Sequence, residues 1–311
     1  MVSERFDFFL ITSFLFYTKL LESKGRKFDW SKFFVGRILR LTPLYLFAVM
    51  IVFVLVTIAS NGVAHDSALY ITKCIVRWLS CTMLGAPNIN QVDARIMVAG
   101  VVWSLPYEWI FYFALPLLGL TARVRAAWPL LALSVASLVF AAIQGLTLSF
   151  ATVFAAGMIA ALFVRDARFT RFAGGRGASL VVVVLALLLL LFPTAFGMAQ
   201  LVLLTAAFSL IAAGTSFFGV LTCATSKWFG EFAYSIYLLH GILLFVAINF
   251  IVGVDTVRSL TPVMYWLFIA ALVPVLLGVC FLTFQWIEKP GMSLTPYVLK
   301  AWRRAPKEAA I

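Results

Sequence analysis

Long runs of apolar residues dominate the chain, and the short segments between them carry most of its charges. A membrane-spanning α-helix needs about 20 mostly apolar residues. Nine stretches approach or exceed this length, and they lie at residues 6–22, 43–60, 100–120, 128–143, 150–164, 178–192, 198–218, 230–252 and 262–287. The pattern therefore predicts an all-α fold, a polytopic transmembrane helical bundle of about nine spans.

The segment 61–99 departs from this pattern. Its part 68–86 is apolar, but Lys73 and Arg77 interrupt it. Because a charge inside a span costs several kcal/mol, we expect an amphipathic or re-entrant piece within a loop here.

The apolar runs stop near the carboxyl end of the chain, which marks a boundary between the spans and a tail. No internal repeat or separate soluble domain is visible. We therefore expect an integral-membrane bundle over 1–290 and a short basic cytoplasmic tail over 291–311.

Composition supports a membrane protein and excludes several other classes. Hydrophobic residues make up 64% of the 311 residues and charged residues only 12%, against about 25% charged in soluble domains. Such a chain is neither disordered nor a soluble globular domain. The four cysteines have no CxxC spacing and are interpreted as small apolar side chains; they are Cys74, Cys81, Cys223 and Cys280.

The net charge of +12 indicates cytoplasmic loops and a lipid bilayer as partner, and no nucleic acid. With nine spans, most basic residues fall on one side, including seven between Lys19 and Arg40. The opposite side receives only Arg5, Lys73, Arg77, Arg95 and Arg258. The positive-inside rule then predicts a cytoplasmic C-terminus and an external N-terminus, in what we expect to be a bacterial inner membrane.

Arg37 and Arg40 lie at the predicted inner end of the second span. Residues three apart share one face of a helix, so both guanidinium groups would point the same way and suit phosphate oxygens. Ordinary anchoring of a helix at the cytoplasmic surface would explain them equally well.

Glu108 lies within the span 100–120, with no lysine or arginine within a helical turn. Intramembrane carboxyl groups are expensive and commonly functional. Pro106 and Pro116 remove backbone donors nearby. Glu108 is thus a candidate site residue, and the alternative is a protonated structural carboxyl bonded to backbone carbonyls.

Two further polar residues stand out in the last two predicted spans. His240 lies in the eighth predicted span, with Tyr237 and Tyr234 three and six residues before it, so the three share roughly one face. Glu288 ends the last span and could pair with an inner arginine. A structural histidine and an ordinary helix terminus are the alternatives.

The sequence resembles membrane-bound acyltransferase family 3, the O-acyltransferases of surface carbohydrates. The stretches FFLITSFLF, FVGRILRLTPLY, VWSLPYEWIFYFALP, FGEFAYSIYLLH and IEKP resemble the family's FFxxSGFL, RxxRLxPxY, WSLxxExxFYxxxP, LGxxSYSIYLxH and ExP segments in the same order. The likeness covers nearly the whole chain. It implies transfer of an acyl group, most often acetyl, from cytoplasmic acyl-CoA to a hydroxyl of a lipid-linked or surface glycan.

The resemblance also implies roles for individual residues. Arg37 and Arg40 would bind the phosphates of the acyl-CoA donor, Glu108 would belong to the buried site, and His240 would line it. Because His240 is the only histidine placed to act, we take Glu108 and His240 as the catalytic candidates. The site would be lined by Trp103, Ser104, Tyr112, Tyr234, Tyr237 and Glu288. Acyl-CoA is a substrate here, so no bound cofactor and no metal are expected.

One departure affects the catalytic base. The family places a helix with an arginine, and a histidine about ten residues later, before its FFxxSGFL segment, and no residue of this chain matches it. Either the true start lies upstream, which we favour, or the chain is an inactive or repurposed member. A transporter or flippase of a glycan or anionic substrate remains the alternative function, although no repeat symmetry supports it.

Overall fold

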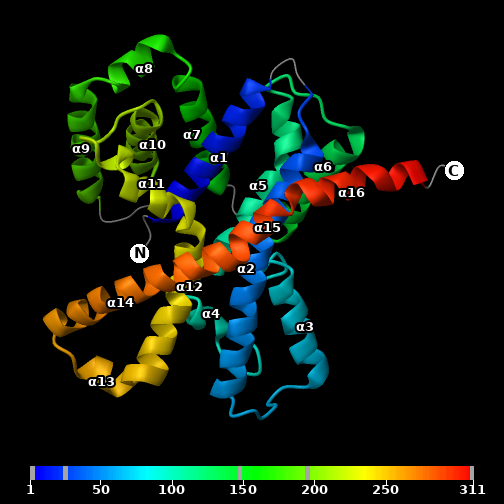
Figure 1. The fold of residues 1–311 in the computed structure, drawn as a ribbon, viewed down its shortest axis with the longest axis vertical. Coiled ribbons are helices and arrows are strands. Elements are labelled where there is room, and N and C mark those ends of the chain that lie inside the picture. The colour runs from blue at the N-terminus through cyan, green and yellow to red at the C-terminus, as the bar shows by residue number, and fades with distance from the viewer. Residues whose placement is uncertain (1–3, 24–26, 146–148, 193–196, 309–311) are drawn as a thin grey trace. The chain divides into compact units, whose positions relative to one another are not determined.

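The computed structural model describes residues 4–23, 27–145, 149–192 and 197–308 (Figure 1). In these ranges nearly all regular structure is helical, and the only extended pairing is an isolated bridge between Ile89 and Val92. The predicted all-α class is confirmed. Lys24 and Arg26, two of the basic residues assigned to the cytoplasmic side, lie outside the described residues.

Each of the nine predicted spans coincides with a helix. By length and apolar composition, four helical stretches could cross a membrane; they are Trp30–Ala59, Val101–Gly119, Ala233–Val252 and Pro262–Arg304. A bent pair, Ala167–Ala173 and Gly177–Leu190, would make a fifth if it is one span. Three shorter apolar helices are Trp128–Ile143, Ala151–Phe163 and Met198–Ala212.

The chain divides into two compact units, each assembled from two segments. Unit 1 comprises Met1–Phe28 and Tyr107–Trp228. Its helices are α1 (Glu4–Glu22), most of α5 (Ser104–Gly119), α6 (Trp128–Ile143), α7 (Ser149–Phe163), α8 (Ala167–Ala173), α9 (Arg176–Leu190), α10 (Met198–Ala212) and the start of α11 (Ala224–Glu231).

In unit 1, α1 packs closely against α7. Gly157 makes this possible, because any side chain there would run into the Leu10 carbonyl and the Ser13 hydroxyl. Beside this crossing, the rings of Phe9 and Phe154 lie 5.1 Å apart. The close contact depends on a residue without a Cβ atom, as is usual where membrane helices approach each other.

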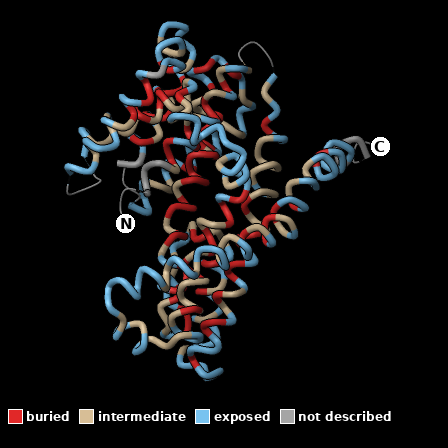
Figure 2. Tube along the Cα trace, turned by 60° about the vertical axis from the view of Figure 1, so that its left-hand side comes forward, coloured by how far each residue is buried: buried red, intermediate tan, exposed pale blue. Residues whose placement is uncertain are grey.

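Unit 2 comprises Asp29–Pro106 and Phe229–Ile311. Its elements are α2 (Trp30–Ala59), α3 (Ala68–Leu79), α4 (Ala94–Met97), η1 (Val101–Trp103), α12 (Ala233–Val246), η3 (Ala247–Val252), α13 (Val254–Ser259), α14 (Pro262–Thr283), η4 (Phe284–Glu288), α15 (Lys289–Ser293) and α16 (Thr295–Glu308). Buried and exposed residues alternate along the chain trace (Figure 2). Large apolar side chains of α14 are exposed, among them Trp266 and Val275, as suits a protein surrounded by lipid.

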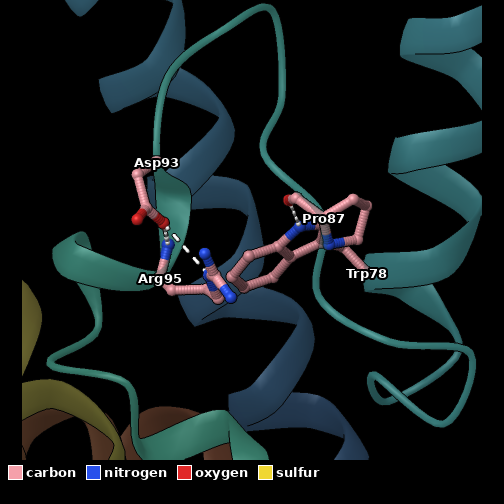
Figure 3. A network of polar contacts seen from close by, with 4 residues as sticks. All are labelled: Trp78, Pro87, Asp93 and Arg95. Atoms are coloured by element: carbon pink, nitrogen blue, oxygen red, sulfur yellow. Dashed lines mark hydrogen bonds and ion pairs between the residues drawn. The ribbon is translucent and has the colours of Figure 1, made fainter.

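The segment 61–99 folds onto α2 as a helix followed by a long loop. The Tyr45 hydroxyl donates to the Trp78 carbonyl at 2.5 Å. The indole N–H of Trp78 donates to the Pro87 carbonyl at 2.9 Å (Figure 3). Nearby, Arg95 and Asp93 form an ion pair of 3.2 Å (Figure 3). The fully buried Trp78 therefore ties helix α3, the loop and α2 together.

Helix α2 begins at Trp30, well before the predicted span 43–60, so Pro43 lies inside the helix and not at its start. Proline has no N–H to donate to the Leu39 carbonyl four residues earlier. Helix α15 approaches at this point, where a Cβ at Gly291 would lie 2.7 Å from the Leu39 oxygen. Proline and glycine together permit this close crossing.

The structure corrects the expectation for one cysteine and adds a helix to the predicted tail. All four cysteines are free, and Cys74 and Cys280 are buried as expected of small apolar side chains, but Cys223 is exposed and bonds to Ser226. The region predicted as a basic tail contains α16, and its Arg303 contacts Asp29 at 2.5 Å.

Candidate functional site

Glu288 is fully buried in unit 2, with 0% of its surface exposed. The Ser235 hydroxyl on α12 donates a hydrogen bond to Oε1 of its carboxylate. Arg40 on α2 is close enough to interact electrostatically with this carboxyl group, although the two form no ion pair among the described residues. Within the described residues, Oε2 has no hydrogen-bond partner.

A π-helical turn brings Glu288 to this position. Residues Phe284–Glu288 at the end of α14 follow this wider helix, and such turns occur often at functional sites. Thr283, one turn earlier, donates to the Ser235 oxygen at 3.4 Å. Three helical segments thus contribute polar side chains to one buried cluster.

The two arginines lie on α2 as predicted, three residues apart and both half-buried. Just beyond them, the Tyr234 hydroxyl donates to the Leu41 carbonyl at 3.0 Å and joins α12 to α2. Arg40 is therefore associated with the Glu288 cluster, and Arg37 lies one turn of helix before it.

A second cluster forms around the carbonyl of Val101. The Tyr237 hydroxyl lies 2.9 Å from this oxygen and 2.8 Å from the hydroxyl of Ser104. The Ser104 hydroxyl lies 3.2 Å from the same carbonyl. Two hydroxyls on different helices thus share one backbone acceptor.

His240 lies one turn beyond Tyr237, and their ring centroids are 6.4 Å apart. Its Nδ1 lies 2.8 Å from the Tyr237 carbonyl and 3.2 Å from the Ile236 carbonyl. Because a carbonyl only accepts hydrogen bonds, Nδ1 carries the proton in this arrangement. In the neutral ring, Nε2 is then the acceptor.

Close approach of backbones supports this second cluster. A Cβ at Gly241, next to His240, would lie 2.6 Å from the backbone nitrogen of Ala99. Ala99 and Gly100 both have left-handed backbone conformations, with φ of 48° and 69°. The turn before η1 therefore lies directly against α12, which explains why Tyr237 reaches Val101.

Glu108 and Tyr112 belong to unit 1. Glu108 is 2% exposed, and the Tyr112 hydroxyl donates to its carboxylate from one turn later on α5. Aromatic rings surround Tyr112, with centroids at 5.3 Å for Phe16 and 5.9 Å for Trp109. The predicted Glu108 is thus a buried carboxyl bonded to a phenol in an aromatic pocket.

The predicted site residues therefore fall into separate groups. Unit 2 holds Arg37, Arg40, Trp103, Ser104, Tyr234, Tyr237, His240 and Glu288, and unit 1 holds Glu108 and Tyr112. Trp103 is half-buried, in η1. In the described part of the chain, no three His, Cys, Asp or Glu side chains are placed to hold a metal ion.

Sequence reasoning missed Ser235 and Thr283. Both are buried and both join the Glu288 cluster. Ser235 lies within the FAYSIYLLH stretch, and a small hydroxyl in such an apolar run was its only signal. Thr283 could not be paired with Glu288 from an ordinary helical period, because the π-helical turn shifts the register.

Comparison with known proteins gives a family. The family model described as an acyltransferase domain, that of acyltransferase family 3, matches residues 7–285. No curated protein and no solved structure matches the chain significantly. The match includes all the site residues above except Glu288, which lies three residues beyond it. Together with the apolar helices, it shows that the chain belongs to acyltransferase family 3 and is an integral membrane acyltransferase.

Proposed function

We propose that this protein transfers an acyl group, acetyl above all, from cytoplasmic acyl-CoA to a hydroxyl of a lipid-linked or surface glycan. The observation that carries the proposal is the orientation of His240. Its Nδ1 is held by backbone carbonyls, so Nε2 can accept a proton from a hydroxyl.

The reaction needs a base and a donor site. His240 Nε2 takes the proton of the acceptor hydroxyl as its oxygen attacks the thioester carbonyl. The tetrahedral intermediate then expels the CoA sulfur, and the imidazolium returns the proton to the leaving thiolate. Ser104 and Tyr237, one turn away, bond to the Val101 carbonyl and to each other, so they position the helix that carries His240.

Arg37 and Arg40 are proposed to bind the donor. Their guanidinium groups share a face of α2 and are half-buried, which favours bidentate contacts with phosphate. Glu288 beside Arg40 would hold that arginine in position. Glu108 is proposed as a second catalytic group beside His240, and Tyr112, Tyr234 and Trp103 as lining residues.

Orientation in the membrane follows from the same proposal. CoA is a cytoplasmic donor, so the end of α2 with Arg37 and Arg40 would face the cytoplasm, in agreement with the positive-inside rule. The C-terminus would then be cytoplasmic and the N-terminus external, in a bacterial inner membrane. Protease protection of tags at each end of the chain checks this arrangement.

The chain's two histidines allow a matched test of the reaction. Membranes containing the protein are incubated with acetyl-CoA labelled in the acetyl group, and label is measured in glycan. We expect transfer by the wild type and by the His65→Ala variant, because His65 lies exposed in the loop after α2. In the His240→Ala variant, the rate of transfer should fall by about 100-fold or more.

Two results would overturn the proposal. Uptake of a glycan or anion into vesicles without covalent label would favour a transporter. Full transfer by the His240→Ala variant would show that His240 is not the base and that another group takes the proton of the acceptor hydroxyl.

A further inference from the structure

An apolar cavity of about 770 Å³ lies within unit 1, between α7, α8, α9 and α10. Neither Glu108 nor Tyr112, the predicted site residues of unit 1, is among its lining residues. Its wall is made almost entirely of apolar side chains, among them Ile159, Phe163, Leu185, Leu201 and Val202. Its volume falls within the range of about 300–1,000 Å³ that is typical of small-molecule sites.

Two of the three hydroxyl side chains in the wall, those of Thr205 and Ser209, bond within their own helix. Thr205 donates to the Leu201 carbonyl at 2.6 Å, and Ser209 donates to the Thr205 carbonyl at 2.6 Å. Both bonds stay within α10, so these hydroxyl protons are used inside the helix. The cavity therefore suits a hydrocarbon chain and offers little to a sugar or a phosphate.

Helix α8 covers one end of the cavity. It is bent by 82° from the helix that follows it, and it joins α7 to α9 (Figure 1). Phe169 and Phe172, three residues apart, both line the cavity. If α9 crosses the membrane, α8 lies along its surface, as interfacial amphipathic helices do.

The neighbouring stripe of α8 is basic. Arg168 and Arg171 precede the two phenylalanines by one residue each, and both are exposed. One residue turns a helix by about 100°, so the arginines lie beside the apolar stripe. Arg165 adds a third exposed guanidinium, whose Nη2 reaches the Thr18 carbonyl at 3.3 Å.

Asp166 is the acidic residue of this short segment, and its position explains the helix. Its carboxylate caps α8 by accepting from the backbone N–H groups of Arg168 and Phe169 at 2.8 and 2.9 Å. The far end of α8 is held by Thr215, whose hydroxyl donates to the Ala173 carbonyl at 2.8 Å. The basic stripe is thus held on the same short helix whose Phe169 and Phe172 line the cavity.

From this combination we propose that unit 1 binds an anionic glycerophospholipid, with one acyl chain in the cavity and its phosphate at Arg168 and Arg171. Charge complementarity selects an anionic headgroup, and the apolar wall selects the chain. The site holds a lipid and does not take part in acyl transfer. The proposal is independent of the reaction proposed above.

Native mass spectrometry of the detergent-purified full chain tests this binding. Phosphatidylglycerol and phosphatidylcholine with identical acyl chains are titrated separately. We expect phosphatidylglycerol to bind more tightly. Because each basic residue near a membrane surface contributes about 1 kcal/mol towards anionic lipid, Arg168→Gln with Arg171→Gln should weaken its binding about thirtyfold.

A second experiment fills the cavity with a larger side chain. Ala206 lines it and is exposed, so Ala206→Trp should prevent binding of both lipids, and Ala206→Phe serves if the larger residue impairs folding. Matched controls are Ala136→Trp on the exposed face of α6 and Arg123→Gln with Arg125→Gln in the loop before it. These variants should bind phosphatidylglycerol as the wild type does.

Three outcomes would overturn the proposal. Phosphatidylglycerol affinity could be unchanged in the double glutamine variant, or unchanged in monodisperse cavity-filled variants. Alternatively, long-chain acyl-CoA could displace the lipid and bind more tightly, in which case the cavity holds the acyl donor.

Discussion

Ser104 and Tyr237 are 133 residues apart in the chain, yet their hydroxyl oxygens lie 2.8 Å apart. Both also lie within hydrogen-bond distance of the Val101 carbonyl, at 3.2 and 2.9 Å. Two hydroxyl protons therefore serve three contacts. This small network joins α12 to the start of α5 inside unit 2 and orients the helix that carries His240.

Removing the Tyr237 hydroxyl should weaken this network only partly. In the Tyr237→Phe variant, the Ser104 hydroxyl still donates to the Val101 carbonyl. We expect unfolding free energy to fall by about 1 kcal/mol, with a much larger loss of acyl transfer. Thermal unfolding in detergent and the labelled-acetyl assay measure the two effects. Tyr297→Phe on the exposed face of α16 is the control, and equal losses in both variants would contradict this role.

The donor-binding prediction concerns Arg37 and Arg40. Lysine keeps the charge but loses the planar fork that contacts two phosphate oxygens at once. Arg37→Lys or Arg40→Lys should therefore weaken acyl-CoA binding roughly tenfold while leaving the protein folded. Equilibrium binding of a non-hydrolysable acyl-CoA analogue measures this. The exposed Arg95 gives the matched Arg95→Lys control, and unchanged affinity in the double α2 variant would refute the assignment.

For Glu108, glutamine keeps the shape and still accepts the bond from Tyr112. The Glu108→Gln variant should thus keep its melting temperature but lose transfer by about 100-fold or more, because it cannot exchange a proton. The assay is run beside Glu231→Gln, an exposed position on α11. Full transfer by Glu108→Gln would make the carboxyl structural.

Packing at the crossing of α2 and α15 depends on Gly291. A Cβ there would lie 2.7 Å from the Leu39 carbonyl oxygen and 3.1 Å from Cγ of Pro43. Gly291→Ala should cost about 1–3 kcal/mol of stability. Gly278→Ala on α14 meets open space, so it should be neutral or stabilise by about 0.5–1 kcal/mol. If Gly291→Ala and Gly278→Ala shifted the melting temperature equally, the crossing of α2 and α15 would have adjusted to the added methyl group, which would contradict the prediction.

Cys223 gives a prediction about pH. The hydrogen bond from the Ser226 side chain lowers the pKa of the Cys223 thiol below its usual value. A lower pKa leaves a larger fraction of the thiol ionised near neutral pH. Alkylation, which needs the thiolate, should therefore be fast already at that pH. Mass spectrometry of iodoacetamide-treated protein should find Cys223 modified faster than Cys81. Ser226→Ala should shift the rate profile to higher pH, and an unshifted profile would exclude this cause.

The sequence by itself determined the class of molecule and its family. Apolar run length predicted every span as a helix, because each backbone polar group in lipid must be paired within the helix itself. Five motifs in order, among them WSLPYEW and SIYLLH, indicated the acyltransferase family that the matching model confirms. These signals are local, and so a linear pattern carries them.

Only the tertiary structure decided which polar groups meet. Spans such as α14 are apolar all round, since lipid and neighbouring helices are equally apolar environments, so no periodicity indicates which face is buried. The pairing of Ser235 with Glu288 depends on how α12 and α14 pack and on a π-helical turn. The cavity beneath α8 likewise exists only where four helices converge, because its volume is what their side chains leave unfilled.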